Sequence, residues 1–175
     1  MDAIIFIADT LLTLTVYAFL LRLLLQWSRA DFRNPLAQAV MKLTDWFVLP
    51  ARKVLPPVGR IDTASVVAVL LAQAAATGIV FMMSTGIVMP AGALLWSALR
   101  AIAFAVINLY TFAIIVYALL SFVAPGTYSP AVGLLNSLCE PLLRPVRQVL
   151  PVAGGLDFSP LLVIIALQAL KILLR

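Results

Sequence analysis

Four long apolar stretches constrain the fold of this 175-residue chain more than any other feature. They run from about residue 3 to 27, from 63 to 84, from 98 to 123 and from 157 to 174. The hydrocarbon core of a bilayer is about 30 Å thick, and a helix of about 20 apolar residues crosses it. We therefore expect an all-α membrane protein with four transmembrane helices. A short connector is expected at 85–97, where glycine and proline interrupt the apolar pattern.

The composition argues against a soluble enzyme. Hydrophobic residues make up 64% of the chain and charged residues 11%, whereas soluble domains average about 45–50% and about 25%. The chain has no histidine and one cysteine, Cys139, so most metal sites, catalytic triads and intrachain disulfides are excluded. We expect a non-enzymatic protein without cofactor or metal. The net charge of +5 favours anionic lipid headgroups over nucleic acid as a partner.

Basic residues predict the orientation of the chain. The loops after the first and third stretches carry eight of them, against three at the other ends of the spans. The eight are Arg29, Arg33, Lys42, Arg52, Lys53, Arg60, Arg144 and Arg147. The positive-inside rule then places both loops in the cytoplasm. We expect a multi-pass protein of the bacterial plasma (inner) membrane, with both termini and the 85–97 connector extracytoplasmic.

The sequence repeats itself at an offset of 95 residues. Seven of thirteen positions are identical in the best-matching stretch: Pro50, Arg52, Val54, Leu55, Pro56, Gly59 and Asp62 recur as Pro145, Arg147, Val149, Leu150, Pro151, Gly154 and Asp157. We therefore expect two tandem units, 1–84 and 98–175, each built from a span, an interfacial amphipathic helix and a second span. Because each unit holds two spans, the units should insert in parallel.

Capping signals predict where the short helices begin and end. A good N-cap residue precedes a proline in both units, as Asn34-Pro35 and Ser129-Pro130. Amphipathic helices are expected over about 35–49 and 130–143, with Pro50 and Pro145 stopping them. Asp62 and Asp157 are expected to cap the helices that re-enter the membrane.

The ordered motif resembles the YggT family of bacterial membrane proteins, whose plastid and Gram-positive relatives are called YlmG and CCB3. The second unit carries it nearly in full, as Ser129-Pro130, Cys139-Glu140-Pro141-Leu142, the Pro145 to Pro151 segment and the Gly154 to Pro160 segment. The first unit departs from it at Thr44-Asp45-Trp46 and at Asp62-Thr63-Ala64-Ser65, which lacks the proline. The resemblance implies links to osmotic-stress tolerance and ion uptake, to cell division and envelope organisation, or to cytochrome assembly in plastids. It implies no catalytic residues.

Two sets of polar residues are candidates for function. Arg52 and Arg147, with Lys53 and Arg144 nearby, are suited to lipid phosphate or a partner's acidic groups. The alternative, which we favour, is that each arginine pairs with the aspartate ten residues later or extends to the membrane surface, and so anchors its loop. Gln73 and Gln168 each lie eleven residues after the aspartate that begins their span, which is about 16 Å into the membrane at about 1.5 Å per residue. They could line a polar path, or hydrogen-bond to each other as packing contacts, which we expect.

Other polar or small residues in the apolar segments have structural explanations. Asp9 and Arg22 lie near span ends, where we expect them to reach water. Ala64, Ala68, Ala72 and Ala76 form a smooth ridge for helix packing, or for a dimer interface. Cys139 could be acylated, although an inert thiol is the more common case.

The favoured function is an inner-membrane scaffold or assembly factor. Its basic cytoplasmic face would engage anionic lipid and partner proteins of membrane assembly or cell division, including further copies of itself. The alternative is an ion or osmolyte permeation protein, which needs polar groups at matching depths. Few such groups are present beyond Gln73, Gln168 and Asn108.

Overall fold

The computed structural model describes residues 2–59, 61–123, 129–149 and 157–175. The expected all-helical fold is confirmed for these residues, which form six helices and one isolated bridge between Val58 and Ile61. The helices are α1 (Asp2–Trp27), α2 (Pro35–Val54), α3 (Thr63–Thr85), α4 (Ala91–Val123), α5 (Pro130–Val149) and α6 (Ser159–Leu173).

Within the described ranges, three helices are long and apolar enough to cross a bilayer: α1, α3 and α4. The bounds of α1 and α3 lie close to the expected ones. Helix α4 has 33 residues and begins at Ala91, well before the expected start at residue 98. Helix α6 is apolar but has only 15 residues.

The break between α3 and α4 falls where the sequence predicts it. Gly86 follows the last residue of α3 with φ of 74°, and its N–H donates to Met82 O at 2.9 Å. A residue in this left-handed conformation ends a helix. Glycine suits the position because a side chain at that φ would be strained. Helix α4 then begins directly after Pro90.

The beginnings of α2 and α5 agree with the capping prediction, but their ends do not. Asn34 Oδ1 accepts from the N–H of Leu36 at 2.9 Å, and Ser129 Oγ accepts from the N–H of Val132 at 3.2 Å. The prediction that proline stops both helices is wrong, since α2 contains Pro50 and α5 contains Pro145 as well as Pro141.

Packing accounts for the continuation of both helices. A proline inside a helix removes one backbone hydrogen bond and costs about 3 kcal/mol. In α2, Val48 before the proline is fully buried, and Ala51 and Leu55 after it pack on the core. In α5, Leu143 and Val146 pack on the core on either side of Pro145. In each helix, the apolar contacts before and after the proline offset the loss of its backbone hydrogen bond.

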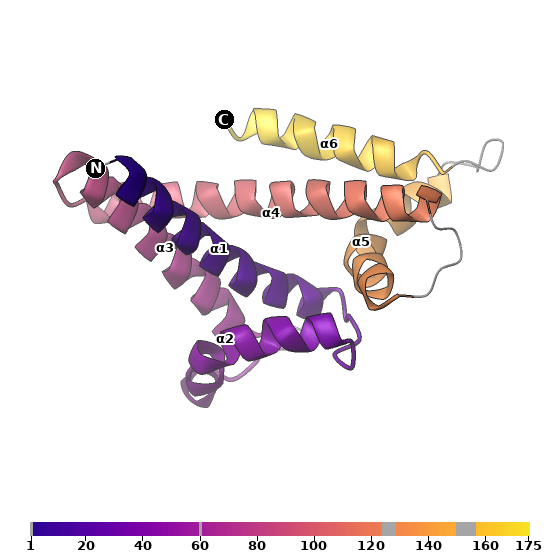
Figure 1. The fold of residues 1–175 in the computed structure, drawn as a ribbon, viewed down its shortest axis with the longest axis horizontal. Coiled ribbons are helices and arrows are strands. Elements are labelled where there is room, and N and C mark those ends of the chain that lie inside the picture. Colours follow the sequence, from indigo (N-terminus) through magenta and orange to yellow (C-terminus); the bar gives the residue numbers. More distant parts are fainter. Residues whose placement is uncertain (1, 60, 124–128, 150–156) are drawn as a thin grey trace.

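The helices form two associated groups (Figure 1). Helices α1 and α3 lie side by side, and α2 packs across their ends. Helix α6 runs along α4, and α5 packs against both. The alanine ridge of α3 lies inside the chain, with Ala64, Ala68 and Ala76 buried, so the packing interpretation holds for these residues. We call the region of α2, α5 and the helix ends next to them the loop face.

Candidate functional site

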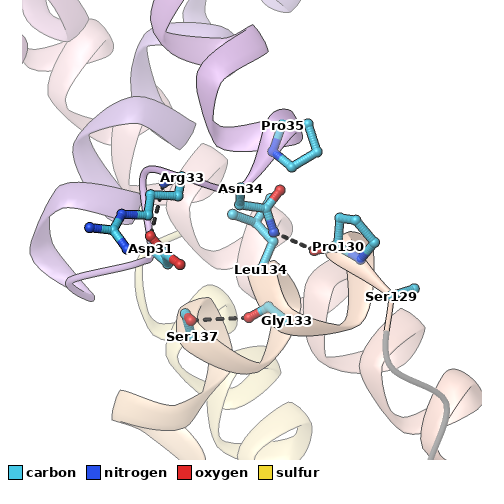
Figure 2. A pocket seen from close by; sticks show the side chains of 9 residues that line it. All are labelled: Asp31, Arg33, Asn34, Pro35, Ser129, Pro130, Gly133, Leu134 and Ser137. Carbon is cyan, nitrogen blue, oxygen red and sulfur yellow. Dashed lines mark hydrogen bonds between the residues drawn. The ribbon is translucent and has the colours of Figure 1, made fainter.

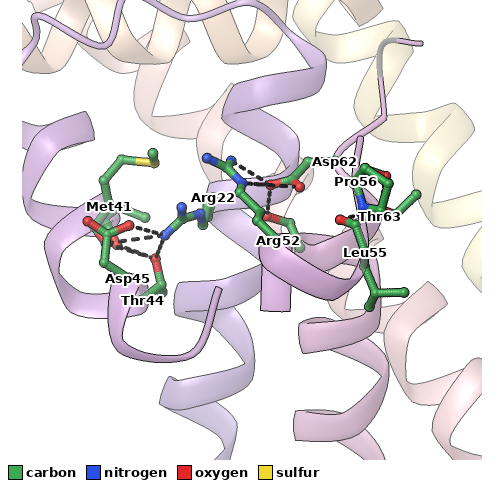
Figure 3. Close-up of polar contacts among 11 residues, drawn as sticks. Arg22, Met41, Thr44, Asp45, Arg52, Leu55, Pro56, Asp62 and Thr63 are labelled. Carbon is green, nitrogen blue, oxygen red and sulfur yellow. Dashed lines mark hydrogen bonds and ion pairs between the residues drawn. The ribbon is translucent and has the colours of Figure 1, made fainter. Parts of the chain in front are cut away.

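The best-defined polar contact of the loop face joins Arg52 on α2 to Asp62 before α3 (Figure 3). Arg52 Nη2 lies 2.6 Å from Asp62 Oδ2, and Nε lies 3.2 Å from the same oxygen. Ser65 Oγ also donates to Oδ2, at 2.6 Å. Asp62 occupies the N-cap position of α3 but makes no capping hydrogen bond. Its carboxylate holds the arginine, and in that respect the capping prediction is wrong.

The environment of Asp62 favours its charged form. Burial by itself raises the pKa of this carboxyl, whose side chain is 8% exposed. The hydrogen bonds from Arg52 and Ser65 and the charge of Arg52 outweigh burial, so the pKa lies below its ordinary value. Arg52 is therefore held in an ion pair within the chain, although 35% of its side chain is exposed.

The connection between α2 and α3 is fixed by backbone contacts as well. Thr63 Oγ1 donates to the carbonyl oxygens of Leu55 at 3.2 Å and Pro56 at 2.8 Å (Figure 3). Gly59 turns the chain with φ of 62°, between the bridged residues Val58 and Ile61. The motif residues Pro56 and Gly59 thus shape a tight turn that brings Asp62 back to Arg52.

Arg147 on α5 makes the corresponding contact to Asp157, with Nε 2.8 Å from Oδ2. It also binds Glu140 Oε2 at 3.0 Å through Nη1 and Tyr117 Oη at 3.4 Å through Nη2. These groups are half-exposed, with 31% of Arg147, 41% of Glu140 and 38% of Asp157 accessible. Asp157 also accepts from the N–H of Ser159 at 2.9 Å, in the first turn of α6. Pro151 and Gly154 lie outside the described residues.

The pKa values in the Arg147 cluster follow from these contacts. Burial lowers the pKa of Arg147, but hydrogen bonds to Tyr117 and Asp157 raise it above the ordinary value overall. Burial raises the pKa of Asp157, and hydrogen bonds from Ser159 and Arg147 lower it by more. One guanidinium here serves two carboxylates, so the cluster of Glu140, Arg147 and Asp157 carries one net negative charge.

Arg22 is the polar residue whose role the sequence interpretation missed. Its side chain is not exposed at all, and Nη1 donates to Asp45 Oδ1 at 2.8 Å and Thr44 Oγ1 at 2.8 Å (Figure 3). The same atom reaches Met41 O at 3.3 Å. The expectation that Arg22 reaches water is therefore wrong. The 95-residue repeat contained a clue to this contact. Both units have an acidic residue at the same position of the amphipathic helix, Asp45 or Glu140, but Arg22 of the first unit corresponds to Tyr117 of the second.

A pocket of about 480 Å³ lies where the N-terminal ends of α2 and α5 meet (Figure 2). Asn34 Nδ2 donates to Pro130 O at 2.6 Å and joins the two helices. The charged residues of the pocket, Asp31 and Arg33, have opposite sign and are both exposed. Lys53 and Arg144, the other two candidate contact residues, are also exposed on the loop face.

The two glutamines do not bind each other. Gln73 Nε2 donates to Thr77 Oγ1, one turn further along α3, at 3.1 Å. Gln168 Nε2 donates to Thr111 Oγ1 at 3.1 Å and so joins α6 to α4. The predicted mutual hydrogen bond is therefore wrong. Gln73 binds within its own helix, and Gln168 alone of the two joins two helices.

Cys139 is fully buried in α5, and burial raises the pKa of its thiol to about 12 although Arg147 opposes this. A thiol of this kind is a poor nucleophile at neutral pH. Across the parts of the chain that the structure describes, no group of three His, Cys, Asp or Glu side chains is arranged to hold a metal ion.

Comparison with known proteins gives a consistent result. A family model described as CCB3/YggT matches residues 1–83 and 96–175. An uncharacterized protein of Pseudomonas aeruginosa is 39% identical over 175 residues, which cover 98% of this chain and 87% of the relative. The uncharacterized protein YggT of Escherichia coli is 34% identical over 172 residues, covering 98% and 88%. No solved structure matches the chain.

Proposed function

Because this chain belongs to the CCB3/YggT family, we propose that it is a non-enzymatic scaffold or assembly factor of the bacterial inner membrane. The proposal has two parts, an arrangement in the membrane and a surface for partners. The resemblance to the family adds the processes in which such a scaffold would act, namely envelope or cell-division organisation and tolerance of osmotic stress.

In the proposed arrangement, α6 is the fourth span and the chain consists of two parallel units. The order of apolar helix, amphipathic helix and apolar helix occurs in α1 to α3 and again in α4 to α6. The family model also matches twice, over 1–83 and over 96–175. The ion pairs Arg52–Asp62 and Arg147–Asp157 stand at equivalent positions of the 95-residue offset. These three observations support a duplicated unit.

The loop face is proposed to be cytoplasmic, with both termini outside. Support comes from the basic residues of the two loops, since short cytoplasmic loops are rich in lysine and arginine. In this orientation α2 and α5 lie at the headgroup level of the inner leaflet. Exposed apolar side chains on α2 suit that depth, among them Leu43 at 64% and Trp46 at 69% exposure.

One observation favours a scaffold over permeation: polar side chains of the apolar helices bind one another. Gln168 binds Thr111, and Lys171 Nζ donates to Asn108 Oδ1 at 2.7 Å, both between α6 and α4. Gln73 is bound within α3. A permeation path needs polar groups that face a common lumen, whereas these groups are bound to one another between α6 and α4 or within α3.

The surface proposed for partners is the exposed basic part of the loop face. Arg52 and Arg147 are held in ion pairs, so we assign them to anchoring the loops. Lys53 and Arg144 are exposed beside them, as are Arg33 and Lys42 nearer the start of α2. Anionic headgroups and acidic segments of membrane proteins are the partners that such a surface attracts.

Photo-crosslinking in living cells tests the proposal. A photoreactive amino acid at position 53 or 144 should crosslink to the same partner protein, and the same residue in place of Val88 should not. Val88 is 79% exposed in the connector after α3 and serves as the matched control. Charge reversal by Arg33→Glu with Lys42→Glu should abolish the crosslink at unchanged protein abundance. Crosslinking that occurs equally from position 88, or that survives charge reversal, contradicts the proposal.

A further inference from the structure

Two adjacent pockets of the molecule differ in polarity. The pocket between the N-terminal ends of α2 and α5 has charged, amide and hydroxyl side chains in its wall (Figure 2). A larger one, of about 630 Å³, is lined by apolar residues except for Tyr17 and Asn108. Leu134 of α5 stands in the wall of both, so the two adjoin. We call the first the Asp31 pocket and the second the Leu134 groove.

The Leu134 groove lies between the two units and runs along α1. Its walls come from α1 and α2 on one side and from α4 and α5 on the other, and its side chains Leu43 and Phe112 are 64% and 69% exposed. On α1 it extends from Leu21 to Leu14, which lie 6 and 13 residues before Trp27. At about 1.5 Å per residue, these positions are about 9 and 20 Å from the end of the helix. Half of a bilayer core is about 15 Å, so the groove has the depth of an acyl chain in one leaflet.

The order of the two pockets matches the order of groups in a phospholipid. In the proposed arrangement α2 and α5 lie at the headgroup level, so the Asp31 pocket is at the depth of headgroups and the Leu134 groove at the depth of acyl chains. A ligand site of this form holds its ligand by apolar contact and selects it by a few polar groups. The selection therefore depends on the polar side chains of the Asp31 pocket.

The charges of the Asp31 pocket complement a headgroup that carries both signs. Asp31 and Arg33 stand at one side of the pocket (Figure 2), and neither is in an ion pair with a residue that the structure describes. Asp31 Oδ1 accepts the backbone N–H of Arg33 at 2.9 Å, and Oδ2 has no partner in the described part of the chain. A phosphate suits the guanidinium, and an ammonium group suits the remaining carboxylate oxygen.

Ethanolamine fits this pair of side chains better than choline or glycerol does. The ammonium group of phosphatidylethanolamine has three N–H donors and is two carbons from the phosphate ester oxygen. The quaternary nitrogen of phosphatidylcholine has no hydrogen to donate to Asp31. Phosphatidylglycerol has no positive group, so its phosphate would lie near Asp31 without an ammonium to offset the repulsion.

We propose that the Asp31 pocket and the Leu134 groove together bind one molecule of phosphatidylethanolamine. The ammonium group binds Asp31, the phosphate binds Arg33, and one acyl chain fills the groove between the two units. This goes beyond the scaffold role, because it assigns a specific lipid to a site within the chain. It rests only on the membrane location proposed above.

Native mass spectrometry of the delipidated full-length protein in detergent tests the headgroup. The protein is mixed with equal amounts of phosphatidylethanolamine, phosphatidylcholine and phosphatidylglycerol that have the same acyl chains. Each chain should retain one phosphatidylethanolamine, with about a two- to fivefold preference over the other two, the range that an exposed ion pair gives. Asp31→Asn should remove the preference. Asp2→Asn, at an exposed site at the other end of α1, is the matched control and should keep it.

A glycine in the wall of the Asp31 pocket allows the site to be filled. Gly133 lies in α5, and a Cβ added there meets no atom within 4 Å. Gly133→Leu should therefore fold, since leucine also has the higher helix propensity, and should retain much less phosphatidylethanolamine because its side chain occupies the pocket. Gly92→Leu is the matched control: Gly92 lies in the first turn of α4, and a Cβ there also meets nothing within 4 Å. That variant should bind as the unaltered protein does.

Three outcomes would overturn the proposal. The first is equal retention of the three lipids, because the groove would then select acyl chains alone. The second is an unchanged preference in Asp31→Asn, or a preference for phosphatidylglycerol, either of which contradicts the pairing of ammonium with Asp31. The third is a folded Gly133→Leu protein with unchanged retention, which would place the lipid elsewhere. Helical circular dichroism shows whether each variant is folded. Failure of the crosslinking experiment would not affect these results.

Discussion

Arg22 Nη1 lies 2.8 Å from Asp45 Oδ1, so a fully buried guanidinium ties α1 to the amphipathic helix α2. Removal of one partner of a buried pair costs about 3–5 kcal/mol, because the other charge stays buried. We expect Asp45→Ala to lower the free energy of unfolding by an amount near the low end of that range, since Asp45 is 33% exposed. Denaturant titration in detergent measures it.

The double variant Arg22→Met with Asp45→Leu should recover most of that loss. An apolar pair of similar volume removes the desolvation cost together with the attraction. Asp2→Ala, at an exposed site near the N-terminus, is the control and should be neutral. A double variant less stable than Asp45→Ala would show that Arg22 has a role besides this contact.

Stability should fall in acid through Asp62 and Asp157. The folded-state pKa of each lies below the ordinary value of 3.8. Their ion pairs therefore contribute fully at pH well above 3.8, and the contribution is lost as pH falls through the lowered values. The free energy of unfolding should be level near pH 6 and decline below about pH 4. Asp62→Asn should have a shallower decline, and an unchanged slope would exclude this carboxylate as a source.

The two glutamines should differ in their effect on stability. Gln168 joins α6 to α4 through Thr111, whereas Gln73 binds Thr77 on its own helix. Gln168→Leu should cost on the order of 1 kcal/mol, the usual value of an interhelical hydrogen bond in a membrane, and Gln73→Leu should cost less. Unfolding in mixed detergent measures both. A folded double variant that had lost ion flux in vesicles would instead favour permeation.

Thiol labelling should establish the orientation without removal of the native cysteine. Cys139 is buried and has a pKa of about 12, so it should not react at pH 7.5 unless the protein is unfolded. In intact cells, an impermeant maleimide should label Asp2→Cys but not Arg33→Cys or Arg144→Cys. The reverse pattern would place the loop face outside.

The long helices could be predicted from the sequence because their signal is local. A run of apolar residues predicts α1 and α3 almost to the residue, and Gly86 marks the end of α3, without knowledge of the neighbours. The caps of α2 and α5 are local in the same sense, since Asn34 and Ser129 bind backbone groups two or three residues away. Such features require no information about packing.

What the sequence did not reveal depends on contacts between distant segments. Helix α2 continues through Pro50 because Val48 and Ala51 pack on other helices. Arg22 is buried because Thr44 and Asp45, on the next helix, come close enough to bind it. The pairing of Arg52 with Asp62 was one of the two interpretations of the sequence, but the loss of the capping hydrogen bond that goes with it depends on how the turn at Gly59 brings the two side chains together. These outcomes do not follow from each residue's own surroundings in the chain.

The unequal lengths of α4 and α6 have a consequence for the surrounding lipid. At 1.5 Å per residue, the 33 residues of α4 span about 50 Å and the 15 residues of α6 about 22 Å. In the proposed four-span arrangement, a bilayer core of about 30 Å is too thin for an upright α4 and too thick for α6. Tilt of α4 accommodates a span that is too long, and local thinning of the bilayer beside α6 accommodates one that is too short. This hydrophobic mismatch would gather short-chain lipids and short-span neighbours around α6, a means of sorting membrane components that needs no specific binding site.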